Sequence, residues 1–194
     1  MEEQAKVPVF KATLIYGIIV GLVTIVWALI LYFIDQSLKT WAMIASPIIF
    51  VGMIVLALIM FRKEYGKGYA RFGQLVLVSF LVGLFASILS AGYNFAIYEF
   101  DEGYLQDTKY YAIEQMDKQF EKMDARYQER LSDDQYDRVE EQMSQQRKKQ
   151  VKRIQERSTM SLALSGIFGT VFMAVIIGLI AGIFIKKEPE PTQV

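Results

Sequence analysis

Four long apolar runs divide the chain, and they contain almost no charged residues. Each run is at least 19 residues long. An α-helix rises about 1.5 Å per residue, so each run can cross a hydrocarbon core of about 30 Å. Backbone polar groups in lipid must be satisfied within the segment, which favours helices. The pattern therefore predicts an all-α protein whose four transmembrane helices cover Ala12–Ile34, Ala42–Met60, Leu75–Ile97 and Met160–Ile185.

A polar insert separates the third run from the fourth and predicts an extramembrane helical hairpin. The insert holds 15 of the chain's 21 acidic residues and 12 of its 21 basic residues. Two apolar stripes recur in it at spacings of three and four, as on amphipathic helices. Between them, Ser132 followed by Gln135 is typical of a capping box and marks a corner at Leu131–Ser132. The stripes are Ile113, Met116, Phe120, Met123 and Tyr127, and then Tyr136, Val139, Met143, Val151 and Ile154.

The second hairpin helix is expected to continue directly into the fourth span. No glycine or proline occurs between Asp133 and Gly166, and these residues most often end a helix. A continuous helix from Asp133 to Ile185 would be about 80 Å long. The predicted organisation is residues 1–97 for three spans, 98–159 for the hairpin, and 160–194 for the fourth span with a short tail.

Basic residues in the short segments predict that both termini are cytoplasmic. The opposite short loop carries only Lys39. Positively charged short loops remain in the cytoplasm, so the hairpin is expected outside. One signal opposes this orientation, because the basic residues between Arg147 and Arg157 lie close to the fourth span. The eight basic residues on the side of the termini are Lys6, Lys11, Arg62, Lys63, Lys67, Arg71, Lys186 and Lys187.

Small residues recur four positions apart within the spans and predict close helix packing. In lipid, such residues let two helix backbones approach each other. Packing inside the four-helix bundle is one interpretation, and a homodimer through one of these faces is the other. The candidate residues are Gly17 and Gly21 in the first span, Gly83 with Ser87 and Ala91 in the third, and Gly178 and Gly182 in the fourth.

The composition removes most catalytic chemistry. The chain has no cysteine and no histidine, so a thiolate nucleophile and the commonest general base and metal ligand are missing. No P-loop, G-x-G-x-x-G, H-E-x-x-H or G-x-S-x-G motif occurs. We therefore expect no enzyme, no catalytic residue, no cofactor, no metal site and no nucleic-acid partner.

Two other functional classes remain open: an accessory subunit of a transporter or channel, and a membrane enzyme. The apolar runs contain no Asp, Glu, Lys or Arg, and ion pathways usually need such groups at depth. A midplane cavity lined by Ser87, Ser90 and Asn94 would favour the transport class. A pocket that joins several hairpin carboxylates at the membrane surface would favour an enzyme.

The first hairpin stripe is the candidate interaction face, with Met116, Phe120, Met123 and Tyr127 as its members. Two amphipathic helices bury little surface by themselves. The two stripes therefore either pack only on each other or bind a protein partner or a second copy, and methionine adapts to varied surfaces. Apart from the lipid bilayer, such a contact is the one kind of partner that the sequence predicts.

Three segments resemble a known family: Phe61–Tyr65, Tyr69–Gln74 before the third span, and Ile97–Leu105 after it. Together they are similar to a bacterial family of small four-span inner-membrane proteins, catalogued as a domain of unknown function, number four-one-nine-nine. The resemblance covers most of the chain, although Glu102 stands where the family pattern has proline. It implies the topology predicted above and an inner-membrane location, and it supplies no activity, substrate or catalytic residue.

Overall fold

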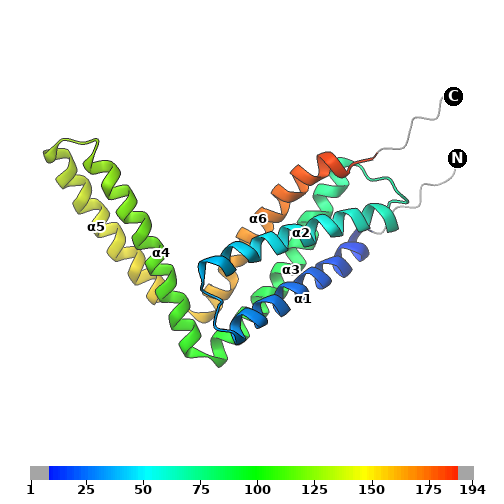
Figure 1. Cartoon of the computed structure of the whole chain (residues 1–194), viewed down its shortest axis with the longest axis horizontal. Helices are drawn as coiled ribbons and strands as arrows, with labels where there is room; N and C mark the ends of the chain where they lie inside the picture. Colours follow the sequence, from blue (N-terminus) through cyan, green and yellow to red (C-terminus); the bar gives the residue numbers. More distant parts are fainter. Residues whose placement is uncertain (1–8, 188–194) are drawn as a thin grey trace. The chain divides into compact units, whose positions relative to one another are not determined.

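The structure, a computed structural model, describes residues 9–187, and this part of the chain is helical almost throughout (Figure 1). Within these residues it has six helices and no strand, which confirms the predicted all-α fold. Lys6 and the predicted tail residues 188–194 lie outside the described residues. The helices are α1 (Val9–Phe33), α2 (Thr40–Glu64), α3 (Phe72–Phe100), α4 (Glu102–Gln128), α5 (Asp133–Gln155) and α6 (Thr159–Ile185).

Four of these helices are long and apolar enough to cross a membrane: α1, α2, α3 and α6. They contain the four apolar runs except for Ile34, which lies one residue beyond the end of α1, so the predicted spans are confirmed. Each helix otherwise extends beyond its run by at most a few residues. At α2 the extension includes Arg62, Lys63 and Glu64, which place charged groups at the helix end, where a span meets the headgroups.

The chain divides into two compact units, which we describe separately. The bundle unit comprises Met1–Asn94 and Ala163–Val194, and the hairpin unit comprises Phe95–Leu162. In the bundle unit, one apolar core takes side chains from all four spans. Buried residues that represent the four helices are Val20 of α1, Ile54 of α2, Val78 of α3 and Ala174 of α6.

The hairpin unit contains α4 and α5, which run antiparallel to each other (Figure 1), together with the last residues of α3 and the first residues of α6. Asp101 is the N-cap of α4, and its carboxylate accepts a hydrogen bond from the backbone N–H of Tyr104 at 2.9 Å. The corner lies at Leu131–Ser132 as predicted, and Ser132 is the N-cap of α5. The predicted capping-box hydrogen bond is wrong, because the Ser132 side chain makes no such bond. The backbone carbonyl oxygen of Ser132 accepts a hydrogen bond from the backbone N–H of Gln135 instead.

The predicted continuous helix from Asp133 to Ile185 is also wrong. α5 ends at Gln155 and α6 begins at Thr159. The side-chain oxygen of Ser158 accepts a hydrogen bond from the backbone N–H of Ser161 at 3.2 Å. Serine competes for backbone hydrogen bonds in this way and favours helix N-termini. The break therefore needs neither glycine nor proline.

Candidate interaction surfaces

Three polar contacts connect α4 with α5 along the length of the hairpin. Because they lie far apart along the two helices, together they fix the register of the antiparallel pair. The contacts are Lys109 Nζ to the carbonyl oxygen of Gln155 (3.1 Å), Arg147 to both carboxylate oxygens of Asp117 (2.7 and 2.8 Å), and the Tyr136 hydroxyl to Asp124 (2.8 Å).

Two of these contacts shift pKa values. The hydrogen bonds from Arg147 lower the pKa of the Asp117 carboxyl below its usual value. The hydrogen bond to the Asp124 carboxylate raises the pKa of the Tyr136 hydroxyl to about 12. The Arg147 side chain is exposed and that of Asp117 is partly exposed, so water and salt weaken such contacts. They therefore order the hairpin more than they stabilise it.

The candidate interaction face on α4 is divided between buried and exposed side chains. Phe120 is buried, and it is the one buried side chain among the described residues of the hairpin unit. Met116 is half-buried. Met123 and Tyr127, one and two turns further along, keep 38% and 40% of their surface exposed. The structure thus places the first two residues in the hairpin seam and leaves the last two open.

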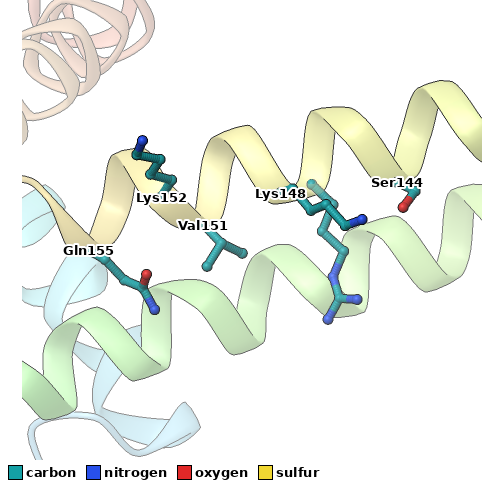
Figure 2. A pocket seen from close by; sticks show the side chains of 6 residues that line it. Ser144, Lys148, Val151, Lys152 and Gln155 are labelled. Carbon is teal, nitrogen blue, oxygen red and sulfur yellow. The ribbon is translucent and has the colours of Figure 1, made fainter.

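An open groove of about 470 Å³ runs along α5, and residues of this helix alone line it (Figure 2). In Figure 2, Val151 lies on the side that faces α4, whereas Lys152 extends away from α4. The groove lacks polar groups converging from a second element, as an enclosed ligand site requires. Its lining residues are Ser144, Arg147, Lys148, Val151, Lys152 and Gln155.

The predicted glycines lie against neighbouring spans. A Cβ atom added to Gly178 would collide with the side chain of Ser79, and one added to Gly83 would collide with Ala174. These positions bring α3 and α6 together. The other three predicted glycines also have a neighbour: Gly17 faces Phe85, Gly21 faces Leu89 and Ala86, and Gly182 faces the ring of Phe72. These contacts are of the kind that packing inside the bundle requires.

Contacts that the sequence analysis missed join the α2–α3 connection to α1 and α6. Their partners lie 48 to 123 residues apart in the chain, so no local pattern connects them. The available signal was the run Gly66–Gly68, which is typical of a tight turn. The contacts are the Tyr16 hydroxyl to Glu64 (2.7 Å), Arg62 Nη1 to the carbonyl oxygen of Ile185 (2.9 Å), and a two-way backbone bridge between Ala70 and Lys187 (2.8 and 3.1 Å).

The buried serines of α3 bond to their own helix, whereas two hydrogen bonds connect different spans: Trp27 Nε1 donates to Ser46 at 3.0 Å, and the Thr24 and Ser90 hydroxyls lie 3.4 Å apart. Ser87, which would line the cavity of a transporter, is buried and donates to the carbonyl oxygen of Leu84 at 2.8 Å. Ser79 bonds in the same way to Val76 at 2.9 Å. Within residues 9–187, no group of three or more carboxylates is placed to hold a metal ion.

Comparison with known proteins identifies a family. No curated protein matches the chain, and no solved structure matches it. The family described as "Protein of unknown function (DUF4199)" matches residues 15–187, a range that contains the four spans almost completely and the whole hairpin. The chain, with its four apolar helices long enough to cross a membrane, therefore belongs to this family, and the match leaves its function open.

Proposed function

We propose that this protein is a non-enzymatic protein of the plasma membrane that works by binding another protein, and that the hairpin provides the binding surface. The exposure of Met123 and Tyr127 beside the buried Phe120 is the observation that carries the proposal. Methionine and tyrosine are enriched at protein interfaces relative to the rest of the surface. Met123 and Tyr127 lie four residues apart, so they occupy one face of α4.

The hairpin buries little apolar surface by itself. Phe120 is the one buried side chain that the structure describes in this unit, and surface polar contacts such as Arg147–Asp117 contribute little to stability. Two-helix units of this size are marginal in water. A partner that covers Met123 and Tyr127 would add apolar burial, at about 25 cal/mol per Å² of surface removed from water.

The chemistry of the hairpin carboxylates supports a non-enzymatic role. Asp117 accepts two hydrogen bonds from Arg147, and Asp124 accepts one from Tyr136. The chain has no histidine or cysteine to act as base or nucleophile. These acids therefore serve the hairpin's own structure in this proposal.

Site-specific photocrosslinking tests the binding surface. A photoreactive phenylalanine analogue is incorporated at Tyr127 in the full chain in its membrane, and at Lys122 as the matched control. Lys122 is exposed on the same helix, and it lies five residues earlier, about 140° around the axis. We expect Tyr127 to give one discrete product with one identified protein, Lys122 to give none, and Met123→Asp to remove the Tyr127 product.

Several outcomes would overturn this proposal. Equal crosslinking from Tyr127 and Lys122 would show random collision, and no product from Tyr127 would show an unused surface. A product between two differently tagged copies would assign a homodimer in place of a separate partner. The identified protein, once purified, must also protect the hairpin from protease, and Met123→Asp must abolish that protection.

We also propose that both termini are cytoplasmic and the hairpin lies outside, because basic residues are concentrated in the short segments beside the termini. A reporter fused after Val194 should be active only in the cytoplasm, and one inserted near Ser132 only outside. Reversed activities would contradict this orientation and assign the dominant signal to the basic residues between Arg147 and Arg157. Changing those residues to glutamine would then restore the proposed orientation.

A further inference from the structure

We propose that one end of the bundle binds the phosphate of an anionic lipid headgroup at a defined site. This end, which we call the basic end, consists of the start of α1, the α2–α3 connection and the end of α6, which lie together in Figure 1. Its exposed cations are Lys11, Lys63, Lys67, Arg71, Lys186 and Lys187.

The described residues of the basic end carry little negative charge that could neutralise these cations. Glu64 is the single acidic residue among described residues 9–16, 61–75 and 182–187. Its carboxylate accepts a hydrogen bond from the Tyr16 hydroxyl at 2.7 Å. Within the described part of the chain, none of these six exposed cations forms an ion pair. Their charge is therefore available to a phosphate, with which lysine and arginine form strong hydrogen bonds.

The α2–α3 connection is a tight turn closed by its own backbone. The backbone N–H of Gly68 donates to the carbonyl oxygen of Arg62 at 2.9 Å, and that of Tyr69 donates to Gly66 at 2.8 Å. A Cβ atom on Gly66 would collide with the carbonyl oxygen of Tyr69, so this close approach requires glycine. Lys67 has a φ of 49°, a left-handed conformation that non-glycine residues seldom adopt. This turn therefore fixes the backbone of Lys67.

The end of α6 is bonded to this turn. Ala70 and Lys187 exchange backbone hydrogen bonds of 2.8 and 3.1 Å, and Arg62 Nη1 donates to the carbonyl oxygen of Ile185 at 2.9 Å. Cations more than a hundred residues apart in the chain are thus held on one surface. A topology signal requires only basic residues in the right segment. A topology signal does not need the backbone bridge between Ala70 and Lys187. A group of cations that is already held together, however, loses less conformational entropy when it binds a phosphate.

An exposed aromatic residue places this surface at headgroup depth. Tyr69 keeps 44% of its surface exposed, and the Lys187 ammonium lies 5.6 Å from the centre of its ring. Tyrosine is enriched where the membrane meets water, and basic groups beside a span attract anionic lipids. The α1–α2 loop at the other end of the bundle provides a matched control, because it carries one base, Lys39, and one acid, Asp35.

Native mass spectrometry of the full chain in detergent, titrated with phosphatidylglycerol, tests the site. We expect one tightly bound lipid at saturation and much weaker binding of zwitterionic phosphatidylethanolamine. Changing Lys67→Gln together with Arg71→Gln should weaken phosphatidylglycerol binding about 25-fold, at about fivefold per cation. The charge-conserving pair Lys67→Arg with Arg71→Lys, and the opposite-end variant Lys39→Gln, should bind like the unchanged chain.

Each remaining outcome contradicts the proposal. Equal binding of the two lipids, or many lipids bound without saturation, would mean diffuse attraction in place of a site. An equal loss in Lys39→Gln would mean a general charge effect. Competition by millimolar glycerol phosphate or inorganic phosphate would assign a site for a free phosphate. The melting temperature of each variant without lipid must match that of the unchanged chain, and if the glutamine pair alone fails this, Lys186→Gln with Lys187→Gln replaces it.

Discussion

In the bundle, sixteen buried residues form one core, fifteen from the four helices and Ala70 from the α2–α3 connection, whereas in the hairpin unit Phe120 alone is buried among the described residues. The reverse holds for charge. All three ion pairs of the described chain lie in the hairpin, where their side chains remain largely exposed. Close packing of apolar side chains therefore stabilises the bundle, whereas little apolar burial and a few polar contacts hold the hairpin together.

The two units should accordingly respond to different changes. Close-packed helices lose stability when volume is added, because neighbouring atoms have no space to move into. A hairpin held by surface contacts tolerates most substitutions, yet it depends on the few apolar atoms that it does bury. Acid should affect the hairpin first, since its carboxylates take part in the contacts and the core of the bundle has no charged groups.

The largest effect is expected from Gly178→Leu. Because a Cβ atom at this position would already collide with Ser79, leucine must push α6 away from α3. Overpacking of this kind costs about 1–3 kcal/mol, which should lower the melting temperature in detergent by about 5–10 °C. Gly169→Leu is the matched control, since it lies on the same helix and has no neighbour within 4 Å of the added atom.

The mass of the particle separates the two interpretations of the glycine faces. Packing within one chain predicts that Gly178→Leu leaves the mass unchanged, and a homodimer predicts that the mass halves while the chain stays folded. Gly182→Leu should have a smaller effect, because its added atom meets the ring of Phe72 at 3.2 Å and a side chain can move. Equal melting temperatures for Gly178→Leu and Gly169→Leu would show that this face does not pack.

A smaller effect, confined to the hairpin, is expected from Phe120→Asp. An unpaired charge in a buried position is strongly unfavourable, so the variant should be cleaved by protease within the hairpin while all four spans remain inserted. Met123→Asp is the control, because Met123 is exposed and can accept a charge. In the purified chain, without the proposed partner, we expect Met123→Asp to keep the protease resistance of the unchanged chain. Wild-type resistance in Phe120→Asp would mean that the stripe is not a packing surface.

The fold could be predicted wherever local pattern decides it. The spans follow from the length and apolarity of the runs, and the corner at Leu131–Ser132 follows from the change of stripe. The break after Gln155 was missed because it depends on a single serine, Ser158, whose side chain bonds to a backbone N–H. Serine at that position has the sequence signature of a cap, and a cap can mark a helix boundary without glycine or proline.

The candidate sites could be predicted less well, because tertiary neighbours decide them. Gly178 and Gly169 are the same residue in the same helix, yet one faces Ser79 and the other faces open space. The four-residue spacing identified Gly178 and Gly182 as a pair, but it did not indicate which helix they contact. The bond from Arg62 to Ile185 spans 123 residues, and no periodicity within either helix indicates it.

The smallest effect is expected from acid. Because Arg147 holds the pKa of Asp117 below its usual value, this contact contributes stability above the ordinary carboxyl pKa of about 3.9, and the contribution is lost as the pH falls through the lowered value. Hydrogen exchange of the α4 segment around Asp117, corrected for intrinsic rates, should therefore show constant protection from pH 7 to pH 5 and a loss below about pH 4. For an exposed pair the loss should be less than about fivefold.

Asp117→Asn isolates this contribution from the other carboxylates, which also become protonated in acid. The variant should start with lower protection at pH 7, and its difference from the unchanged chain should vanish in acid, where both side chains are neutral. Arg147→Gln should behave in the same way, because it removes the donor of the same two hydrogen bonds. A difference that persists unchanged at pH 3 would mean that the pair does not order the hairpin through charge, and that the seam around Phe120 alone sets its register.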